Sequence, residues 1–252
     1  INSTSTSDMS LEEAVNLIRG PKGTRVALTV IRQGWDKSKE IKITRDVIQV
    51  PSLKLEFKDD GKIAYIKLSQ FSAKAGNEFA QAAVEILNSK AEKIILDLRN
   101  NPGGYLEISQ DIAGWLLPSG QIVTIEDFAG KQEQKIYKAQ GNYRLEKYPL
   151  VILVNQGSAS ASEILAGALR DNRGIKLIGE KSFGKGSVQE LEELKGSSSL
   201  KITVAHWLTP KGQLISEIGL EPDIKIEITE KDYENEKDPQ LDKALEIIKE
   251  IK

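Results

Sequence analysis

The middle of the chain alternates between short apolar runs and longer amphipathic stretches. Residues 63–68, 94–98 and 150–155 are apolar runs of strand length, whereas residues 74–88 carry apolar side chains at the helical period. The helix positions predicted to face a core are Phe79, Ala83, Ile86 and Leu87. Apolar runs without alternation suit strands covered on both faces, so the pattern predicts a sheet with helices packed on it.

The same reading extends toward the carboxyl end of the chain. The predicted elements are a helix over 107–117, a hairpin over 121–137, strands over 175–179 and 200–208, and a helix from Pro239 onward. The hairpin turns at Ala129-Gly130, a pair that suits a tight turn. No internal repeat or low-complexity tract interrupts this order.

The first 47 residues form a separate pattern. Asp8 or Ser10 can cap a helix that ends near Gly20, and residues 23–32 and 40–45 alternate as two strands of a hairpin. Pro51 follows, and because proline cannot donate to a sheet ladder, its segment is predicted to be an edge strand or a linker.

The composition of the chain narrows the classes of function that it can have. The chain has 252 residues, a net charge of −2, 39% hydrophobic and 29% charged residues, which is typical of a globular protein and argues against a nucleic-acid binder. No stretch approaches the roughly 18 apolar residues of a membrane span. The absence of cysteine excludes disulfides, thiol catalysis and thiolate metal sites, and nothing in the sequence indicates a metal or organic cofactor.

Candidate chemistry gathers in residues 148–190. Ser158, Ser160 and Ser162 follow the buried strand at 150–155 and occupy a turn and the first positions of a helix. Ligands usually bind at the carboxyl edge of such strands. Backbone N–H groups at a helix start lack intrahelical partners and attract negative charge. A serine here would therefore have an oxyanion site beside it, although capping and small-residue packing also explain any one of the three.

A serine nucleophile needs a base within hydrogen-bond reach. The single histidine, His206, lies in a strand-like run and is expected to be structural. Lys185 is the stronger candidate, because flanking glycines allow close approach of the backbone and because burial or nearby positive potential can keep a lysine neutral. Lys181 is a competitor whose neighbour Glu180 suggests a solvated ion pair. Two other readings of Lys185 are a solvated loop cation and a phosphate-binding lysine, but no P-loop pattern follows a strand here.

Three motifs in this region resemble one family. They are Gly157-Ser-Ala-Ser-Ala-Ser-Glu163, Gly167-Ala-Leu-Arg-Asp171 and Ser182-Phe-Gly-Lys-Gly-Ser-Val-Gln189. They are similar to those of the carboxyl-terminal processing peptidases, or tail-specific proteases, which are serine–lysine endopeptidases. The resemblance implies Ser160 as the nucleophile, Lys185 as the general base 25 positions on, and Gln189 as the group that orients the lysine.

A second landmark is Asp97-Leu-Arg-Asn-Asn-Pro-Gly-Gly104. In the family that it resembles, an oxyanion is held by the backbone N–H of the last glycine and by that of the residue after the nucleophile, here Gly104 and Ala161. The alternative is a helix-entry turn capped by an asparagine. Asp97 and Arg99 are expected to pair or to brace the turn, and Asp171 to brace a helix end; none of these three is assigned chemistry.

The resemblance covers nearly the whole chain and predicts its organisation. Residues 1–47 resemble the carboxyl-terminal half of a PDZ domain, residues 48–230 form the peptidase core, and residues 231–252 form a charged carboxyl-terminal helix. The implied fold is a mixed-sheet α/β or α+β core with helices packed on it, like that of ClpP and crotonase. The PDZ half has two explanations: the sequence begins inside the domain, or the domain is naturally reduced.

We therefore expect a serine-type endopeptidase that cleaves proteins near their carboxyl termini. The expected partners are protein or peptide substrates, above all unfolded carboxyl-terminal tails, with no nucleic acid; a membrane anchor in the parent protein, an oligomer and an activating adaptor stay open. The resemblance implies an extracytoplasmic location such as the periplasm or cell envelope. Two alternatives remain: a catalytically silent peptide-binding or adaptor module, and an esterase or acyltransferase using the same dyad.

Overall fold

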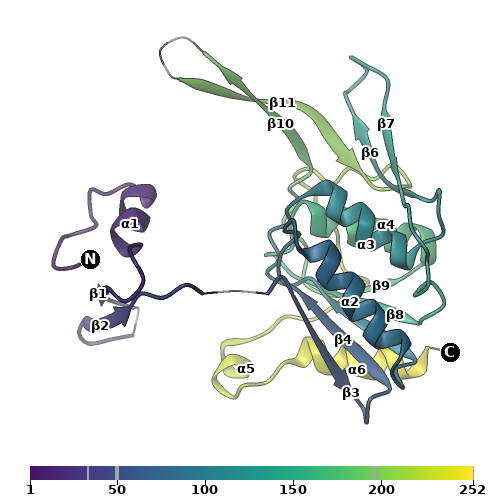
Figure 1. Cartoon of the computed structure of the whole chain (residues 1–252), viewed down its shortest axis with the longest axis horizontal. Helices are drawn as coiled ribbons and strands as arrows, with labels where there is room; N and C mark the ends of the chain where they lie inside the picture. The colour runs from purple at the N-terminus through teal and green to yellow at the C-terminus, as the bar shows by residue number, and fades with distance from the viewer. Residues whose placement is uncertain (33, 49–50, 195, 197, 252) are drawn as a thin grey trace. The chain divides into compact units, whose positions relative to one another are not determined.

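The structure is a computed structural model that describes residues 1–32, 34–48, 51–194, 196 and 198–251. The chain divides into two compact units, Ile1–Val50 and Pro51–Lys252 (Figure 1). None of the helices within the described ranges is long and apolar enough to cross a bilayer.

The smaller unit contains one helix and one hairpin, as the pattern predicts. Helix α1 (Leu11–Ile18) begins at Ser10, whose hydroxyl accepts from the Glu13 N–H while the Glu13 carboxylate accepts from the Ser10 N–H. This reciprocal capping satisfies two N–H groups that a helix start otherwise leaves unpaired. Strands β1 (Arg25–Val30) and β2 (Lys39–Thr44) pair antiparallel.

The larger unit is built on a six-stranded mixed sheet of order β12-β9-β8-β5-β4-β3. All neighbours are parallel except β3, which pairs antiparallel with β4 at the sheet edge. The segment after Pro51 is therefore an edge strand and not a linker. The strands are β3 (Leu53–Lys58), β4 (Ile63–Leu68), β5 (Lys93–Asp97), β8 (Leu150–Val154), β9 (Lys176–Gly179) and β12 (Ile224–Lys225).

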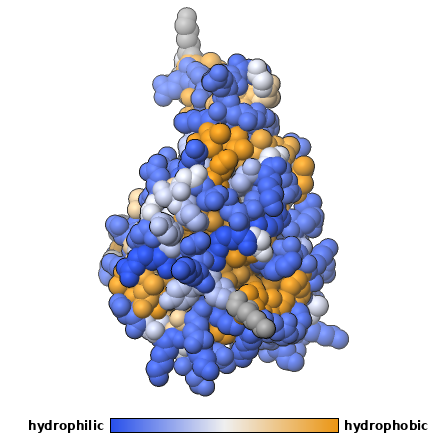
Figure 2. Space-filling model, turned by 90° about the vertical axis from the view of Figure 1, so that its right-hand side faces the viewer, coloured by the Kyte–Doolittle hydropathy of each residue, from blue (hydrophilic) through white to orange (hydrophobic). Residues whose placement is uncertain are grey.

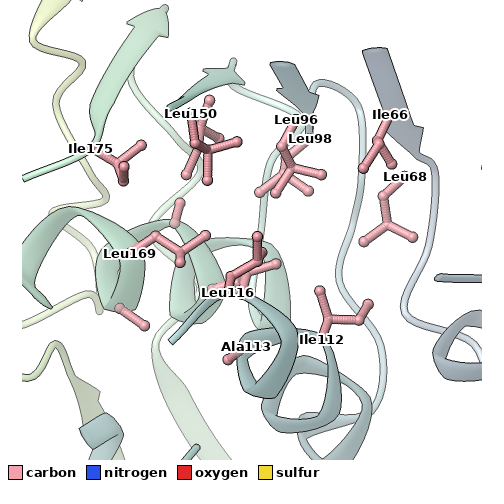
Figure 3. Packing of buried hydrophobic residues seen from close by; sticks show 14 of the residues in the cluster. Ile66, Leu68, Leu96, Leu98, Ile112, Ala113, Leu116, Leu150, Leu169 and Ile175 are labelled. Carbon is pink, nitrogen blue, oxygen red and sulfur yellow. The ribbon is translucent and has the colours of Figure 1, made fainter. Parts of the chain in front are cut away.

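Helices cover both faces of this sheet (Figure 1). Helices α2 (Ala75–Leu87), α3 (Leu106–Leu116) and α4 (Ala161–Arg173) pack on one face, and α6 (Pro239–Glu250), which follows the short α5 (Glu230–Glu234), packs on the other. Figure 3 shows buried leucines of the sheet, and of the segment just after β5, facing those of α3 and α4; the labelled leucines are Leu68, Leu96, Leu98, Leu116, Leu150 and Leu169. This confirms the predicted α/β core with a mixed sheet.

A second, four-stranded antiparallel sheet has the order β10-β11-β6-β7. Its strands are β6 (Ile122–Asp127), β7 (Lys135–Lys138), β10 (Ser187–Glu193) and β11 (Ser199–Leu208). The β10–β11 hairpin projects from the core (Figure 1), and Figure 2 shows hydrophobic patches scattered over a largely hydrophilic surface. The sequence pattern did not predict β10, because its exposed and acidic residues lack alternation; pairing with β11 makes it a strand.

Candidate active site

Three parallel strands deliver the predicted functional segments to one edge of the six-stranded sheet. Strands β5, β8 and β9 are neighbours, and the chain leaves their carboxyl ends as residues 98–105, 155–160 and 180–186. Backbone hydrogen bonds hold these exits together, from the Ala159 N–H to the Asn101 carbonyl at 3.0 Å and from the Phe183 N–H to the Ser158 carbonyl at 3.0 Å. Residues far apart in sequence therefore meet in one place.

Ser160 differs from the serines on either side of it. Ser158 and Ser162 are fully buried, and their hydroxyls donate to the Leu98 and Asn101 carbonyls at 2.8 and 2.9 Å. Ser160 is only partly buried and has φ 56° and ψ −118°, a backbone conformation that non-glycine residues rarely adopt. Such strain persists only where the surroundings enforce it, and it collects at functional sites. The geometry therefore separates the middle serine from its two structural neighbours.

The glycine turn after β5 lies directly against Ser160. A Cβ atom on Gly103 would lie 2.6 Å from the Ala159 oxygen and 2.7 Å from Ser160 Cβ, so no larger residue fits without movement. The next residue, Gly104, has φ 145° and is held by hydrogen bonds of its neighbours to Phe71. Within the described residues, neither the Gly104 N–H nor the Ala161 N–H donates to a protein acceptor. Both residues lie in the segments that meet at Ser160.

Asn101 shapes this turn but does not cap the following helix. Its Oδ1 accepts from the Gly103 N–H at 2.9 Å, and its Nδ2 donates to the Leu68 carbonyl at 2.8 Å. The residue at the N-cap of α3 is Tyr105, which makes no side-chain cap. The alternative reading of the segment as an asparagine-capped helix entry is therefore wrong.

A buried carboxylate joins the serine turn to the lysine segment. Glu163, 1% exposed, accepts through Oε2 from the Ser160 and Lys185 N–H groups, both at 2.9 Å. Its Oε1 accepts from the Gly184 N–H at 2.7 Å and from the Ser182 hydroxyl at 2.6 Å. All four partners are donors, so the carboxylate is fully satisfied.

The sequence reasoning did not single out Glu163. The available signal was its position three residues after Ser160, the serine-x-x-glutamate spacing of a helix start. In this structure the glutamate does more than cap α4, because the same oxygen that accepts from Ser160 also accepts from Lys185.

The side chains of Lys185 and Gln189 are exposed. Among the described residues no hydrogen bond joins Lys185 Nζ to Ser160 Oγ, or either of them to Gln189. Gln189 lies on β10 beside an irregularity between Val188 and Gln189, and such bulges re-aim side chains. The structure thus links the Lys185 and Ser160 backbones through Glu163, whereas Lys185 itself is exposed.

The remaining candidates have structural partners. Lys181 pairs with Glu221 at 3.0 Å and not with Glu180. The His206 ring meets the Ser216 hydroxyl at 2.9 Å, and Asp171 accepts from the Lys211 N–H at 3.0 Å, which braces the end of α4. Among the described residues, no group of three or more His, Asp or Glu side chains is placed to hold a metal ion.

Asp97 and Arg99 form a buried pair beneath the glycine turn. Arg99 Nη2 lies 2.7 Å from Asp97 Oδ2, and the Tyr65 hydroxyl donates to the same oxygen at 2.6 Å. Burial, followed by the Asp97 charge and hydrogen bond, raises the pKa of Tyr65. Arg99 also reaches Asp238 at 2.7 Å. The expected bracing of the turn therefore involves a residue distant in sequence.

A model of peptidase family S41 matches residues 62–226 of the chain. The chain belongs to this family. The matched range contains the serine, lysine and glycine-turn segments, so the candidate active site lies within the part of the chain that the S41 model matches.

Individual S41 relatives agree with this assignment. The chain is 41% identical to a carboxyl-terminal-processing protease of Synechocystis sp., over 98% of this chain and 59% of the relative. It is 39% identical to the carboxy-terminal processing protease CtpA of Bacillus subtilis, over 90% of this chain and 48% of the relative. The chain thus spans roughly half to three fifths of these relatives.

The S41 fold has also been seen in solved structures. The photosystem II D1 C-terminal processing protease superposes with a TM-score of 0.69 at 30% sequence identity, covering 90% of this chain and 61% of that one. This match includes the mixed sheet and the flanking helices.

Proposed function

We propose that this S41 chain is the peptidase core of a carboxyl-terminal processing protease, a serine endopeptidase that cleaves protein substrates near their carboxyl termini. The observation that carries the proposal is the Glu163 carboxylate, which accepts from both the Ser160 and Lys185 N–H groups. A buried carboxylate in that position fixes the backbone of a candidate nucleophile relative to that of a candidate base, and this is what acyl transfer by a dyad requires.

The first half-reaction forms an acyl-enzyme. Lys185 Nζ, as a neutral amine, takes the proton of Ser160 Oγ while that oxygen bonds to the scissile carbonyl carbon. The Gly104 and Ala161 N–H groups donate to the oxyanion that develops. The ammonium of Lys185 then gives its proton to the leaving amine, and the C–N bond breaks.

The second half-reaction releases the acyl group. Lys185 takes a proton from a water molecule while the water oxygen attacks the carbonyl carbon of the ester. The ammonium of Lys185 then returns the proton to Ser160 Oγ as the ester bond breaks. Gln189 orients Lys185 as an uncharged acceptor, so it does not stabilise the ammonium form as a carboxylate would.

The exposed Lys185 side chain implies that substrate completes the site. A bound peptide would exclude water from the surroundings of Ser160 and bring the amine toward its hydroxyl, since catalytic hydrogen bonds are often long in the free enzyme and shorten in the complex. The same exposure favours the alternative of a catalytically silent peptide-binding module, in which the two side chains stay apart.

We propose that residues 1–47 are part of a PDZ domain that presents substrate tails, that residues 48–230 form the peptidase core, and that residues 231–252 form a helical extension. The proposed substrates are unfolded carboxyl-terminal tails of proteins. The proposed location is extracytoplasmic, in keeping with a processing role.

An unfolded protein substrate separates the candidate functions. Casein and a p-nitrophenyl ester would each be incubated with the chain and with its Ser160→Ala variant. Cleavage of casein by the unaltered chain alone supports the peptidase. Turnover of the ester alone supports an esterase, and binding of casein without cleavage supports the silent module.

Replacing Glu163 with glutamine is expected to lower peptidase turnover about 10²-fold. Four donor groups face the Glu163 carboxylate, and the NH2 of a glutamine side chain cannot accept a hydrogen bond from any of them. The donors that face this NH2 would be left buried without a partner, which costs about 1–3 kcal/mol for each one. The measurement is kcat for casein-derived peptides beside a thermal unfolding curve. Glu221→Gln, which removes an exposed carboxylate, is the matched control. Wild-type turnover in Glu163→Gln would show that the four hydrogen bonds do not organise the site.

A further inference from the structure

The first turn of helix α6 reaches back to the sheet edge that carries the proposed active site. Asp238, the N-cap of α6, accepts from Arg99 Nη1 through Oδ1 at 2.7 Å and from Nη2 through Oδ2 at 2.8 Å. This two-point pairing is the geometry that makes arginine–carboxylate contacts strong and directional. Arg99 is 8% exposed and stands five residues before Gly104 in the same turn.

The same helical turn also contacts the segment that leads to Lys185. Gln240, fully buried, accepts from Arg99 Nη1 through Oε1 at 3.1 Å. Its Nε2 donates to Glu180 Oε1 at 3.2 Å and to the Ile226 carbonyl at 2.8 Å. One buried amide therefore joins the exit of β5 to the exit of β9, on either side of the strand that delivers Ser160.

Other contacts hold α6 in place independently of Asp238. Lys93, at the start of β5, donates to the carbonyls of Ile248, Lys249 and Ile251 at 2.7 to 3.0 Å, which satisfies the last turn of the helix. Ala244 and Ile248 are fully buried against the sheet. Helix α6 is thus tied at its end to Lys93, at the start of β5, and at its beginning to Arg99, two residues after β5 ends.

We infer that Asp238 and Gln240 are positioning residues of the proposed active site: they set the spacing between the turn that carries Gly104 and the segment that carries Lys185. Helix α6 lies beyond residues 62–226, the range that the family model matches. The inference deepens the proposed function and rests on it, because the positioned groups are the proposed oxyanion donor and base. The pairing of Asp238 with Arg99 affects the position of the turn because Arg99 is buried: a buried guanidinium that loses one carboxylate partner must rearrange.

The test compares Asp238→Asn with Lys93→Gln. Asparagine is as good an N-cap as aspartate, so the variant keeps α6 and loses the charged pair with Arg99. Lys93→Gln removes the tie at the other end of α6 and is the control for loss of helix stability. Peptide-resolved hydrogen exchange is measured over residues 99–105 and 180–186, together with kcat and KM for a casein-derived peptide.

Asp238→Asn is expected to speed exchange in both segments about tenfold and to lower kcat about tenfold, with KM unchanged, because the misplaced groups act in the transition state. Lys93→Gln is expected to speed exchange in α6 alone and to keep wild-type kcat. Asp238→Glu, which restores the charge, should recover most of the kcat.

Unchanged exchange in either segment would overturn the inference, as would equal effects of Asp238→Asn and Lys93→Gln, or faster exchange at wild-type kcat. If the unaltered chain hydrolyses no substrate, the proposed peptidase fails, and the exchange rates alone still decide whether α6 positions the two segments.

Discussion

The Ser160→Ala variant is expected to lose at least about 10⁴-fold in kcat for peptide hydrolysis, with its fold intact. Alanine removes the oxygen that would form the acyl bond, and loss of a serine nucleophile leaves only the rate enhancement from oxyanion binding and substrate positioning. Ser160 is partly buried, its N–H bond to Glu163 does not involve the hydroxyl, and alanine keeps the Cβ that lies against Gly103, so the thermal unfolding midpoint should stay near that of the unaltered chain.

The neighbouring serines are matched controls for this variant. Ser162→Ala removes one buried hydrogen bond to a backbone carbonyl. Ser158→Ala removes two hydrogen bonds, the one that its hydroxyl donates to the Leu98 carbonyl and the one that it accepts from the Asn155 N–H. The free energy of unfolding should fall by about 1 kcal/mol for each bond lost. Both should keep most of their turnover. An active Ser160→Ala beside an inactive Ser158→Ala or Ser162→Ala would move the nucleophile to a different serine.

The Lys185→Ala variant is expected to lose about as much turnover as Ser160→Ala, because an unassisted serine hydroxyl is a weak nucleophile near neutral pH. Lys185→Arg should be equally inactive. A guanidinium keeps the positive charge but stays protonated at any usable pH, so it cannot take the serine proton. Measuring kcat for both variants therefore separates a base from a fixed charge.

Lys181→Ala supplies the control for the lysine variants. Lys181 lies in the same segment and pairs with Glu221 on the surface, where an ion pair contributes about 0–1 kcal/mol. Its removal should leave kcat nearly unchanged. Substantial turnover in Lys185→Arg would instead assign Lys185 an electrostatic role and leave the base unidentified.

The sequence pattern was sufficient for the core of the fold. Apolar runs at residues 94–98 and 150–155 predicted the buried strands that became β5 and β8, because a strand covered on both faces needs apolar side chains on both. The turns after them carried the glycines and serines that meet in the structure. Local patterns of this kind follow from burial and backbone freedom, so they are readable without coordinates.

Contacts made across long sequence separations were not readable. Arg99 and Asp238 lie 139 positions apart, and their pairing depends on how α6 docks on the sheet. The role of Glu163 was not readable for a related reason, because the bonds that it accepts from the Gly184 and Lys185 N–H groups arise only when β9 lies beside β8. Strand β10 could not be predicted from its own residues, because its extended conformation depends on pairing with β11.

The most direct measurement of the proposed mechanism is the site of the acyl-enzyme. The chain would be mixed with an activated peptide ester, quenched in acid within the first turnover and digested, and the adduct located by tandem mass spectrometry. The mechanism predicts one acyl group on the Ser160 hydroxyl, absent in Ser160→Ala and strongly reduced in Lys185→Ala. An adduct on another residue, or peptide cleavage by the unaltered chain with no adduct at any time, would contradict it.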